Sequence, residues 1–241
     1  EYFMRANPPA RLILASQKIK LLREFGADVV GLLRFNESLA NTSSDDFIKK
    51  LIVGRLNAKA VFIGPDFYFG KNRQGNVFVM QKAGECFGFE TVSVVPQLQH
   101  SARISSSLIR DDLQNGRLKD AAEKLGRAYA LEGKVVRGKQ LGRTLGYPTA
   151  NIRFRGKKPA LMGIYATWVH GVGEHAIASV SSVGTRPTVK GVEPLLEAHL
   201  FDFDGDLYGK KIRIEFIEKL RDEVKFDGLD ALVIQMDQDA E

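Results

Sequence analysis

The sequence predicts two consecutive domains, an α/β domain followed by a small antiparallel β-barrel with a C-terminal helix. Its length of 241 residues exceeds the usual size of one domain. Residues 14–125 alternate helical and strand patterns, which is typical of a parallel sheet covered by helices. Beyond Gly126 short β-rich segments are separated by glycine-containing turns. We therefore place the first domain at residues 1–125 and the second at 126–241.

The first domain is expected to alternate helices with strands. Apolar residues at helical spacing predict three helices, at residues 14–26, 43–56 and 76–88. Continuous apolar runs predict three strands, at residues 27–35, 59–64 and 89–95. Two short helices are predicted at residues 105–115 and 117–126. Ligands of such sheets usually bind beside the first strand and the turn after it. Because this sequence opens on a loop and a helix, we expect the first strand, its turn and a helix to be missing from it.

The second domain is expected to be built from short strands. Strand patterns predict five of them, at residues 129–138, 163–171, 175–184, 196–205 and 210–220. We interpret Asp204-Gly205 as a type I′ hairpin turn. A final helix is expected after these strands, capped by Asp227. The sequence therefore predicts an antiparallel sheet or small barrel followed by one helix.

The composition indicates a globular protein without a membrane span. Hydrophobic residues make up 44% and charged residues 27% of the chain, and no apolar run approaches the ~20 residues that a membrane span needs. The start of the chain lacks the pattern of a secretion signal. A single cysteine, Cys86, excludes an internal disulfide and a Cys-rich zinc site, which favours the cytoplasm. We interpret Cys86 as a small apolar side chain that is buried on a helix face.

The net charge of +6 favours an anionic partner, either a nucleic acid or a phosphorylated small molecule. The lysines and arginines are dispersed among acidic residues and form no blocks. A mixed, solvated surface is the commoner reason for such a pattern. Charge alone therefore does not choose between these partners.

A glycine-rich loop precedes a conspicuous "GYPTAN" sequence. Gly138, Gly142 and Gly146 are separated by Lys139 and Arg143 among other residues. Glycines let backbone N–H groups approach phosphates closely, so the loop is a candidate nucleotide cover. It is not a Walker A sequence. The alternative to a nucleotide cover is a long hairpin loop of a barrel.

Thr149 and Asn151 lie within that sequence. In an extended chain residues two apart face the same side, so a hydroxyl and an amide oxygen would lie together. Hard oxygen ligands of this kind suit Mg²⁺ bound together with nucleotide phosphates. Pro148 restricts the backbone directly before them. A local turn held by these side chains is the alternative.

Glu197 is the candidate general base. It shares a strand face with His199 and lies among apolar residues, where a carboxylate is costly unless it has a task. A salt-bridged structural glutamate is the alternative to a general base.

The sequence shows no calcium or zinc motif. The nearby "DFDGD" lacks the later ligands of a calcium loop, and the four histidines show no zinc spacing.

Several motifs of the sequence resemble those of a known family. "GRTLGYPTAN", "GIYA", "SVGTRPT", "LEAHLFDFDGDLYG" and "KLRDEVKF" resemble, in order and spacing, the riboflavin kinase signatures of the bacterial bifunctional FAD synthetases. The resemblance covers nearly all of residues 129–241. It implies a Rossmann-like nucleotidyltransferase domain, here incomplete, followed by a riboflavin kinase barrel. It also implies ATP-dependent phosphorylation of riboflavin to FMN and, in the intact protein, adenylylation of FMN to FAD.

The resemblance assigns roles in the second domain. It implies that Thr149 and Asn151 hold Mg²⁺ and ATP phosphates, and that Glu197 accepts a proton from the ribityl 5′-hydroxyl of riboflavin. The loop would cover the nucleotide, with Gly138, Gly142, Arg143 and Gly146 at the ATP site. Arg221 would lie near the flavin or its new phosphate.

The first domain carries two further motifs of that family. "GPDFYFGKNRQGN" and "ISSSLIR" resemble motifs of its adenylyltransferase domain. The residues implied near flavin and ATP are Asp66, Phe67, Phe69, Gly70, Lys71, Arg73, Ser106, Ser107 and Arg110. A capped helix start is the alternative for the serines. The superfamily carries a His-x-Gly-His turn, yet no histidine precedes His100 here. We therefore expect this chain not to perform adenylylation.

Two other hypotheses remain open from the residues. A basic barrel could bind RNA, although its strands lack regularly exposed aromatic residues for base stacking. A flavin-binding domain without chemistry would bind riboflavin and never consume ATP. The leading hypothesis involves small molecules alone, with no nucleic acid and no membrane, and leaves the oligomeric state open.

Overall fold

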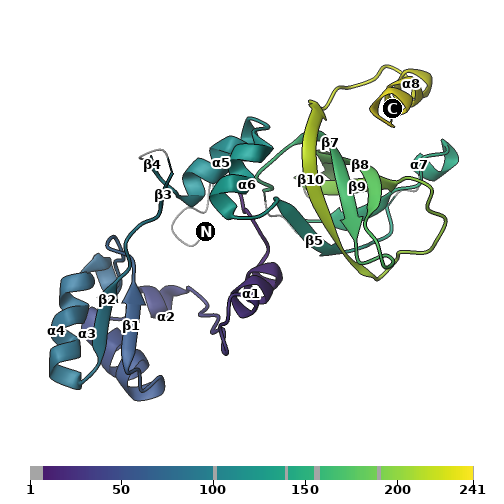
Figure 1. Cartoon of the computed structure of the whole chain (residues 1–241). Coiled ribbons are helices and arrows are strands. Elements are labelled where there is room, and N and C mark those ends of the chain that lie inside the picture. The colour runs from purple at the N-terminus through teal and green to yellow at the C-terminus, as the bar shows by residue number, and fades with distance from the viewer. Residues whose placement is uncertain (1–7, 100–101, 139–140, 155–157, 189–190, 241) are drawn as a thin grey trace. The chain divides into compact units, whose positions relative to one another are not determined.

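The computed structural model describes residues 8–99, 102–138, 141–154, 158–188 and 191–240 (Figure 1). Its contacts divide the described chain into two compact units. One is built on residues 31–104, and the other combines residues 8–30 with residues 105–240. Residues 105–125 thus share a unit with the strands that follow, and the domain boundary near Gly126 stays a prediction.

The first unit holds a parallel pair of strands covered by helices. Strands β1 (Ala60–Ile63) and β2 (Glu90–Ser93) run parallel. The helices of this unit are α2 (Glu37–Ala40), α3 (Ser44–Asp46), the π-helix η1 (Phe47–Arg55), the 3-10 helix η2 (Lys71–Arg73) and α4 (Val77–Phe87). Strands β3 (Leu98–Gln99) and β4 (Ala102–Arg103) form a short antiparallel pair. The predicted α/β character of this region is confirmed.

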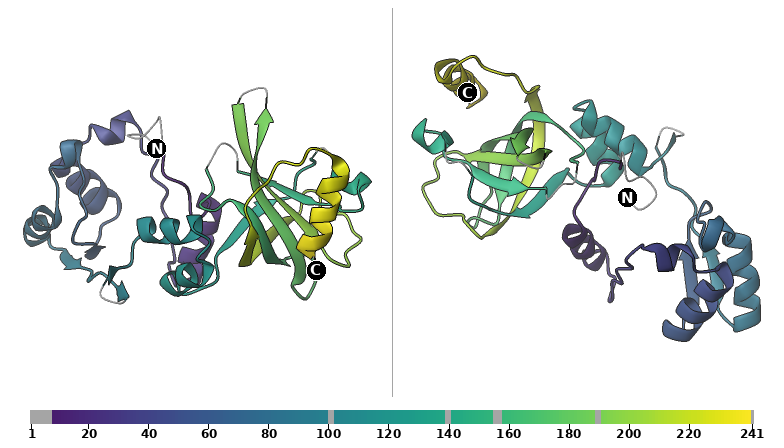
Figure 2. Two further views of the ribbon diagram at one scale, coloured as in Figure 1. Left: turned by 90° about the horizontal axis from the view of Figure 1, so that it is seen from above. Right: turned by 180° about the vertical axis from the view of Figure 1, so that it is seen from behind.

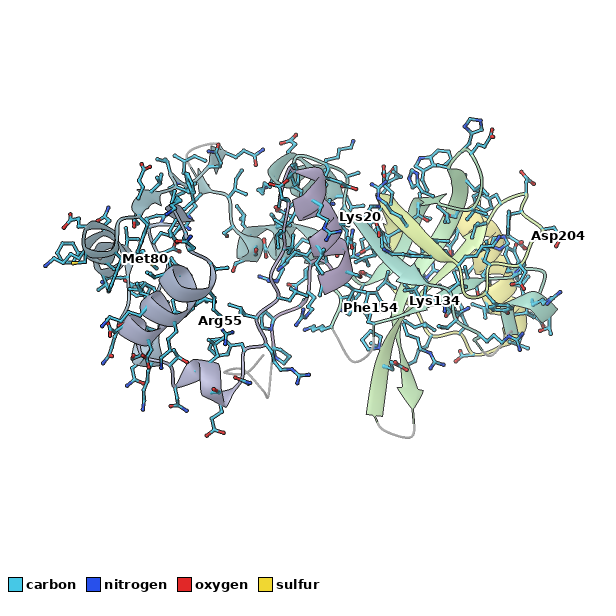
Figure 3. The ribbon with its side chains drawn as sticks, turned by 90° about the horizontal axis from the view of Figure 1, so that it is seen from below. Lys20, Arg55, Met80, Lys134, Phe154 and Asp204 are labelled. Atoms are coloured by element: carbon cyan, nitrogen blue, oxygen red, sulfur yellow. The ribbon has the colours of Figure 1, made fainter. Side chains whose placement is uncertain are left out.

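The core of this unit joins η1, α4 and the chain on either side of α4. Its buried residues are Ile48, Ile52, Phe69, Met80 and Phe89. Figure 3 labels Met80, which is fully buried on the inner side of α4. This helix begins where Asn76 accepts a hydrogen bond from the Val79 N–H, as expected for an N-cap.

Two expectations for the N-terminal half are wrong. Residues 27–35 form no strand, and Val29, Leu32 and Leu33 are exposed. Among the described residues β1 and β2 pair only with each other, so this apolar run has no neighbouring strand. Cys86 is exposed on α4, because the buried face of that helix carries Met80 and Gly84 and a residue two positions further turns away from it.

The second unit contains an antiparallel barrel. Its strands are β5 (Ala130–Lys134), β6 (Ala150–Arg153), β7 (Gly163–His170), β8 (Ile177–Thr188), β9 (Gly191–Leu200) and β10 (Lys211–Arg221). They are ordered β5-β10-β7-β8-β9-β6. The Val136 N–H donates to the Asn151 carbonyl at 2.8 Å and links the two ends of the sheet. The predicted small barrel is confirmed.

Helices lie on two sides of this barrel within the second unit (Figure 2). They are α1 (Ala15–Glu24), α5 (Ser106–Gln114), α6 (Leu118–Leu125), the single turn α7 (Leu141–Thr144) and α8 (Leu229–Ala240). The Gln17 side chain donates to the Ala130 carbonyl at 2.8 Å, and the Tyr129 hydroxyl donates to the Leu12 carbonyl at 2.7 Å. None of the helices in the described parts of the chain is long and apolar enough to cross a membrane.

Two predictions for the second domain are wrong, the hairpin turn at Asp204-Gly205 and the helix cap at Asp227. Asp204 and Gly205 lie in the connection of residues 201–210 between β9 and β10 (Asp204 is labelled in Figure 3). Those strands are not neighbours in the sheet, so the connection cannot be a two-residue hairpin. Helix α8 begins at Leu229, and its first turn is closed by the Leu232 N–H donating to the Gly228 carbonyl. Asp227 therefore precedes the capping position.

Candidate active site

Two cavities of the barrel unit adjoin at Thr149. The larger has a volume of about 680 Å³ and is lined by the chain after β5, the start of β6, the end of β9 and the β9–β10 connection. The smaller has a volume of about 270 Å³ and is lined by β8, β9, the chain after β10 and α8. Thr149 lines both cavities. Ligands in the two cavities would therefore meet at this residue.

The two cavities differ in chemistry. Charged side chains of the larger cavity are Arg137, Arg143, Asp204 and Asp206. Apolar side chains of the smaller cavity include Leu145, Ile164, Val180, Val224, Phe226, Leu232 and Met236. The larger cavity thus suits a charged ligand, and the smaller one suits an aromatic or aliphatic ligand.

Asn151 and Thr149 lie together at the start of β6. The Asn151 side chain, 5% exposed, donates from Nδ2 to the Thr149 carbonyl at 3.0 Å and to the Thr149 Oγ1 at 3.2 Å. Its Oδ1 is buried and has no hydrogen-bond partner among the described residues. A buried amide oxygen without a partner is costly and is suited to an outside ligand such as a cation.

The glycines of the preceding loop have separate structural causes. A Cβ at Gly138 would lie 2.7 Å from the Asn151 Oδ1, so any other residue would have to displace the Asn151 amide. Gly142 packs against the Tyr147 carbonyl, and Gly146 has a φ of 85° just after α7. Gly138 and Arg143 line the larger cavity, and Gly142 lines the smaller one. Lys139 lies outside the described residues.

Glu197 lies on β9, where it is half-buried and opposite Asn151 of β6. Its Oε1 is 3.5 Å from the Thr149 Oγ1. Glu197 and His199 both line the smaller cavity, which confirms that they share one strand face. The His199 Nδ1 is 2.9 Å from the Pro148 carbonyl and must carry the proton, since a carbonyl only accepts. The predicted base thus lies at the junction of the cavities.

Arg221 lines the smaller cavity and ties α8 to the end of β10. Its Nε and one terminal nitrogen donate to the two carboxylate oxygens of Asp239 at 2.7 and 2.6 Å. Both side chains are largely buried, at 19% and 7% exposure. The Tyr147 hydroxyl donates to Asp237 on the same helix. Helix α8 therefore forms one wall of the cavity, held by its contacts with Arg221 and Tyr147.

One residue of the smaller cavity was not identified from the sequence. Glu223, in the segment after β10, lines the cavity with Glu197. Burial and the charge of Glu197 raise the pKa of Glu223 above the ordinary glutamate value. In the sequence this residue is one of several charges in "KLRDEVKF", and only the fold distinguishes it from its neighbours.

In the first unit, the predicted aromatic and glycine residues shape a loop. The Phe69 side chain is 6% exposed and belongs to the core, with Phe67 stacked on it at 5.6 Å. Gly70 has a φ of 74°, and a Cβ there would lie 2.6 Å from the Ser44 nitrogen. Phe69 and Gly70 therefore support the loop conformation.

The charged residues of this loop are exposed. Asp66 pairs with Arg103 at 2.9 Å, and this hydrogen bond lowers the pKa of the Asp66 carboxyl. The Arg73 guanidinium lies over the Tyr68 ring at 4.6 Å. Lys71 donates its backbone N–H to the Thr42 carbonyl at 2.7 Å. The Lys71 and Arg73 side chains thus remain near the surface as candidate anion contacts.

Ser106, Ser107 and Arg110 lie in the second unit, on α5. Ser105 caps this helix by accepting from the Leu108 N–H at 3.2 Å, so the capped helix start is present. Ser106 and Ser107 are exposed in the first turn. The Arg110 Nε donates to the Ala10 carbonyl at 2.6 Å.

Comparison with known proteins identifies the family. A riboflavin kinase family model matches residues 125–241, and an FAD synthetase family model matches residues 1–108. The bifunctional riboflavin kinase/FMN adenylyltransferase of Haemophilus influenzae is 40% identical over 241 residues, covering 100% of this chain and 78% of the relative. The chain belongs to the bifunctional riboflavin kinase/FMN adenylyltransferase family.

A second member of this family and a solved structure match the chain over nearly its whole length. The Escherichia coli K12 member of this family is 39% identical over 239 residues, covering 99% of this chain and 76% of the relative. The crystal structure of a macrolide-efflux protein from Streptococcus pneumoniae superposes on this chain with a TM-score of 0.77 at 29% identity. It covers 98% of this chain and 77% of that protein.

Proposed function

We propose that the barrel unit of this family member transfers the γ-phosphoryl group of ATP to the 5′-hydroxyl of riboflavin, forming FMN and ADP. The observation that carries this proposal is the position of Thr149, which lines both cavities and lies 3.5 Å from the Glu197 carboxylate. ATP in the larger, charged cavity and riboflavin in the smaller, apolar cavity would bring their reacting groups to this junction.

The residues at the junction fit a magnesium ion. The Asn151 Oδ1 is buried without a partner among the described residues, and the Thr149 Oγ1 lies beside the Asn151 amide. Both are hard oxygen donors of the kind that Mg²⁺ prefers. When bound there with ATP, the ion would neutralise charge on the phosphates. Arg143 in the same cavity would add a fixed positive charge near them.

Glu197 is proposed as the general base. The ribityl 5′-hydroxyl gives its proton to the Glu197 carboxylate as its oxygen bonds to the γ-phosphorus. The bond between that phosphorus and the β–γ bridging oxygen breaks, and ADP leaves with the electron pair. The apolar wall formed by Ile164, Val180 and Phe226 would hold the isoalloxazine ring and keep water away from the junction.

We further propose adenylylation of FMN to FAD as the activity of the adenylyltransferase-like domain. Ser106, Ser107 and Arg110 are the proposed contacts to ATP phosphates. Asp66, Phe67, Lys71 and Arg73 belong to the motif that is proposed to lie near flavin and ATP, and the two cationic side chains suit anionic groups. Phe69 and Gly70 act by shaping the loop. The proposal needs neither a nucleic acid nor a membrane as partner, and the cytoplasm stays the predicted location.

The test is to incubate the chain with riboflavin and Mg-ATP and to separate the flavins by chromatography. FMN with equimolar ADP is the expected product. FAD would show that adenylylation takes place as well, contrary to the expectation from the absent histidine motif. Unchanged riboflavin, with a folded protein that still binds it, would overturn the kinase proposal and leave a flavin-binding domain without chemistry.

A further inference from the structure

The smaller cavity contains a second carboxylate close to the proposed base. Glu223 lies in the segment after β10, and its carboxylate packs against the backbone of β8. A Cβ at Gly184 would overlap the Glu223 carboxylate, so the absence of a side chain there provides its space. The carboxylate also accepts a hydrogen bond from the Thr185 backbone. Glu223 is therefore held in place by β8.

Glu223 and Glu197 occupy the same face of the sheet. Glu197 on β9 pairs in register with Ser182 on β8, and Gly184 lies two residues further along β8. Residues two apart on a strand face the same side. The Glu223 carboxylate thus fills the side-chain position next along the strand from Ser182. The charge of Glu197, together with burial, raises the pKa of Glu223, which agrees with this proximity.

The described lining of this cavity holds more carboxylates than cationic side chains. Among its described lining residues the only Arg or Lys is Arg221, whose guanidinium is bound to both oxygens of Asp239. That pair is neutral overall. Glu197 and Glu223 are the remaining carboxylates of the lining. An ionised Glu223 therefore adds a negative charge to this cavity, and the nearby Arg221 guanidinium opposes only part of it because it is already bound to Asp239.

We infer that Glu223 determines specificity between substrate and product, because its charge disfavours a phosphorylated flavin in a cavity that accepts the neutral polyol. This inference rests on the proposed kinase function. Riboflavin carries no charge, whereas the FMN phosphate is anionic at neutral pH. The phosphate forms next to Glu197, and Glu223 places a negative charge on the same face. Like charges in a partly buried site repel more strongly than in water. Glu223 thereby promotes release of FMN.

The experiment compares the affinities of riboflavin and FMN for the full chain and its Glu223→Gln variant. Binding is measured by flavin fluorescence quenching at pH 8 and low salt, together with inhibition of the kinase by FMN. Removal of one nearby charge should tighten FMN binding by about tenfold. Riboflavin binding should change by less than about threefold, because a neutral ligand does not interact with the net charge. The FMN effect should shrink at high salt.

Asp222→Asn is the matched control. Asp222 adjoins Glu223 in the sequence, but its side chain is 83% exposed, pairs with Lys219 and does not line the cavity. This variant removes the same charge and should leave the ratio of the two affinities unchanged. Equal changes for riboflavin and FMN in Glu223→Gln, no change for either, or the same shift in Asp222→Asn would each overturn the inference.

A second variant covers the case in which Glu223→Gln does not fold. Glu223→Ala also removes the charge and leaves the space at Gly184 open, so it should shift the affinity ratio in the same direction. Wild-type turnover separates this inference from the proposed function. If the wild type makes no FMN, the kinase proposal fails. If it makes FMN but neither variant shifts the ratio, only the role of Glu223 fails.

Discussion

The hydroxyl of Thr149 lies 3.5 Å from the Oε1 of Glu197, at the place where the two cavities of the barrel unit adjoin. The pairing of β6 with β9 creates this relationship, since Asn151 is opposite Glu197 in the register. Thr149 precedes Asn151 by two residues and therefore faces the same side. The proposed metal ligands and the proposed base are thus held by one pair of strands.

Replacement of Glu197 by glutamine should abolish most turnover. A removed general base lowers kcat by about 10² to 10⁴, while riboflavin affinity should change little. Steady-state kinetics of FMN formation measure the effect. Glu218→Gln, at an exposed glutamate of β10, is the matched control and should keep wild-type turnover. Unchanged turnover in Glu197→Gln would reject its assignment as the base.

Thr149→Val and Asn151→Ala should mainly raise the Mg²⁺ and ATP concentrations needed for half-maximal rate, because each removes a hard oxygen donor. We expect an increase of at least about tenfold for Asn151→Ala, since its Oδ1 has no partner among the described residues. Titrations of Mg²⁺ and of ATP check this. Thr149→Ser retains the hydroxyl and should stay near wild type. If the Mg²⁺ and ATP titration curves of Thr149→Val and Asn151→Ala coincided with those of the wild type, they would contradict the metal role.

Gly138→Ala should imitate the loss of Asn151. A Cβ at this position would lie 2.7 Å from the Asn151 Oδ1 and would displace the amide. The expected result is a higher ATP requirement with an unchanged affinity for riboflavin. Gly173→Ala is the matched control, since a Cβ there meets nothing within 4 Å. Equal kinetics for both alanine variants would show that the close approach at Gly138 is not required.

Arg221→Lys should loosen α8. The bidentate pair with Asp239 cannot be reproduced by an ammonium group, which lacks the planar fork of the guanidinium. Hydrogen exchange of the α8 amides should become faster, and the Kd for riboflavin should rise by about tenfold because α8 walls the cavity. Arg213→Lys, at a β10 arginine paired with Glu215, should leave both unchanged. Unaltered exchange in Arg221→Lys would contradict the anchoring role.

The raised pKa of Glu223 predicts a pH-dependent effect on stability. Burial and the charge of Glu197 make the folded state hold the Glu223 proton more tightly than the unfolded state does. Ionisation of Glu223 therefore costs stability above its folded pKa, and the cost is absent below its unfolded pKa. Glu223→Gln should raise Tm at pH 8, with the gain fading as the pH falls to 4.5, the ordinary glutamate value. A gain independent of pH would exclude this cause.

Local patterns predicted much of the fold. Helices α1, α4, α5 and α6 lie within their predicted ranges, because apolar residues at helical spacing and capping residues are local signals. Strands β7 and β10 follow their β-rich runs to within one residue, whereas β8 continues beyond its predicted end, β9 begins before its predicted start and β6 was not predicted. The strand predicted at residues 27–35 is wrong, since an apolar segment becomes a strand only beside a partner strand and the described chain provides none there. The hairpin turn predicted at Asp204-Gly205 is wrong for a related reason, because a hairpin needs two strands that are neighbours in the sheet.

By itself the sequence determined which chemical groups are available and which of them are close along the chain. The two-residue spacing of Thr149 and Asn151 and the strand face shared by Glu197 and His199 follow from extended backbone geometry. Only the tertiary structure decided that Thr149 meets Glu197, that Asn151 buries an oxygen without a described partner, and that Glu223 rather than Asp222 lines the cavity. These relationships depend on the register between strands distant in sequence and on burial, which local spacing does not specify.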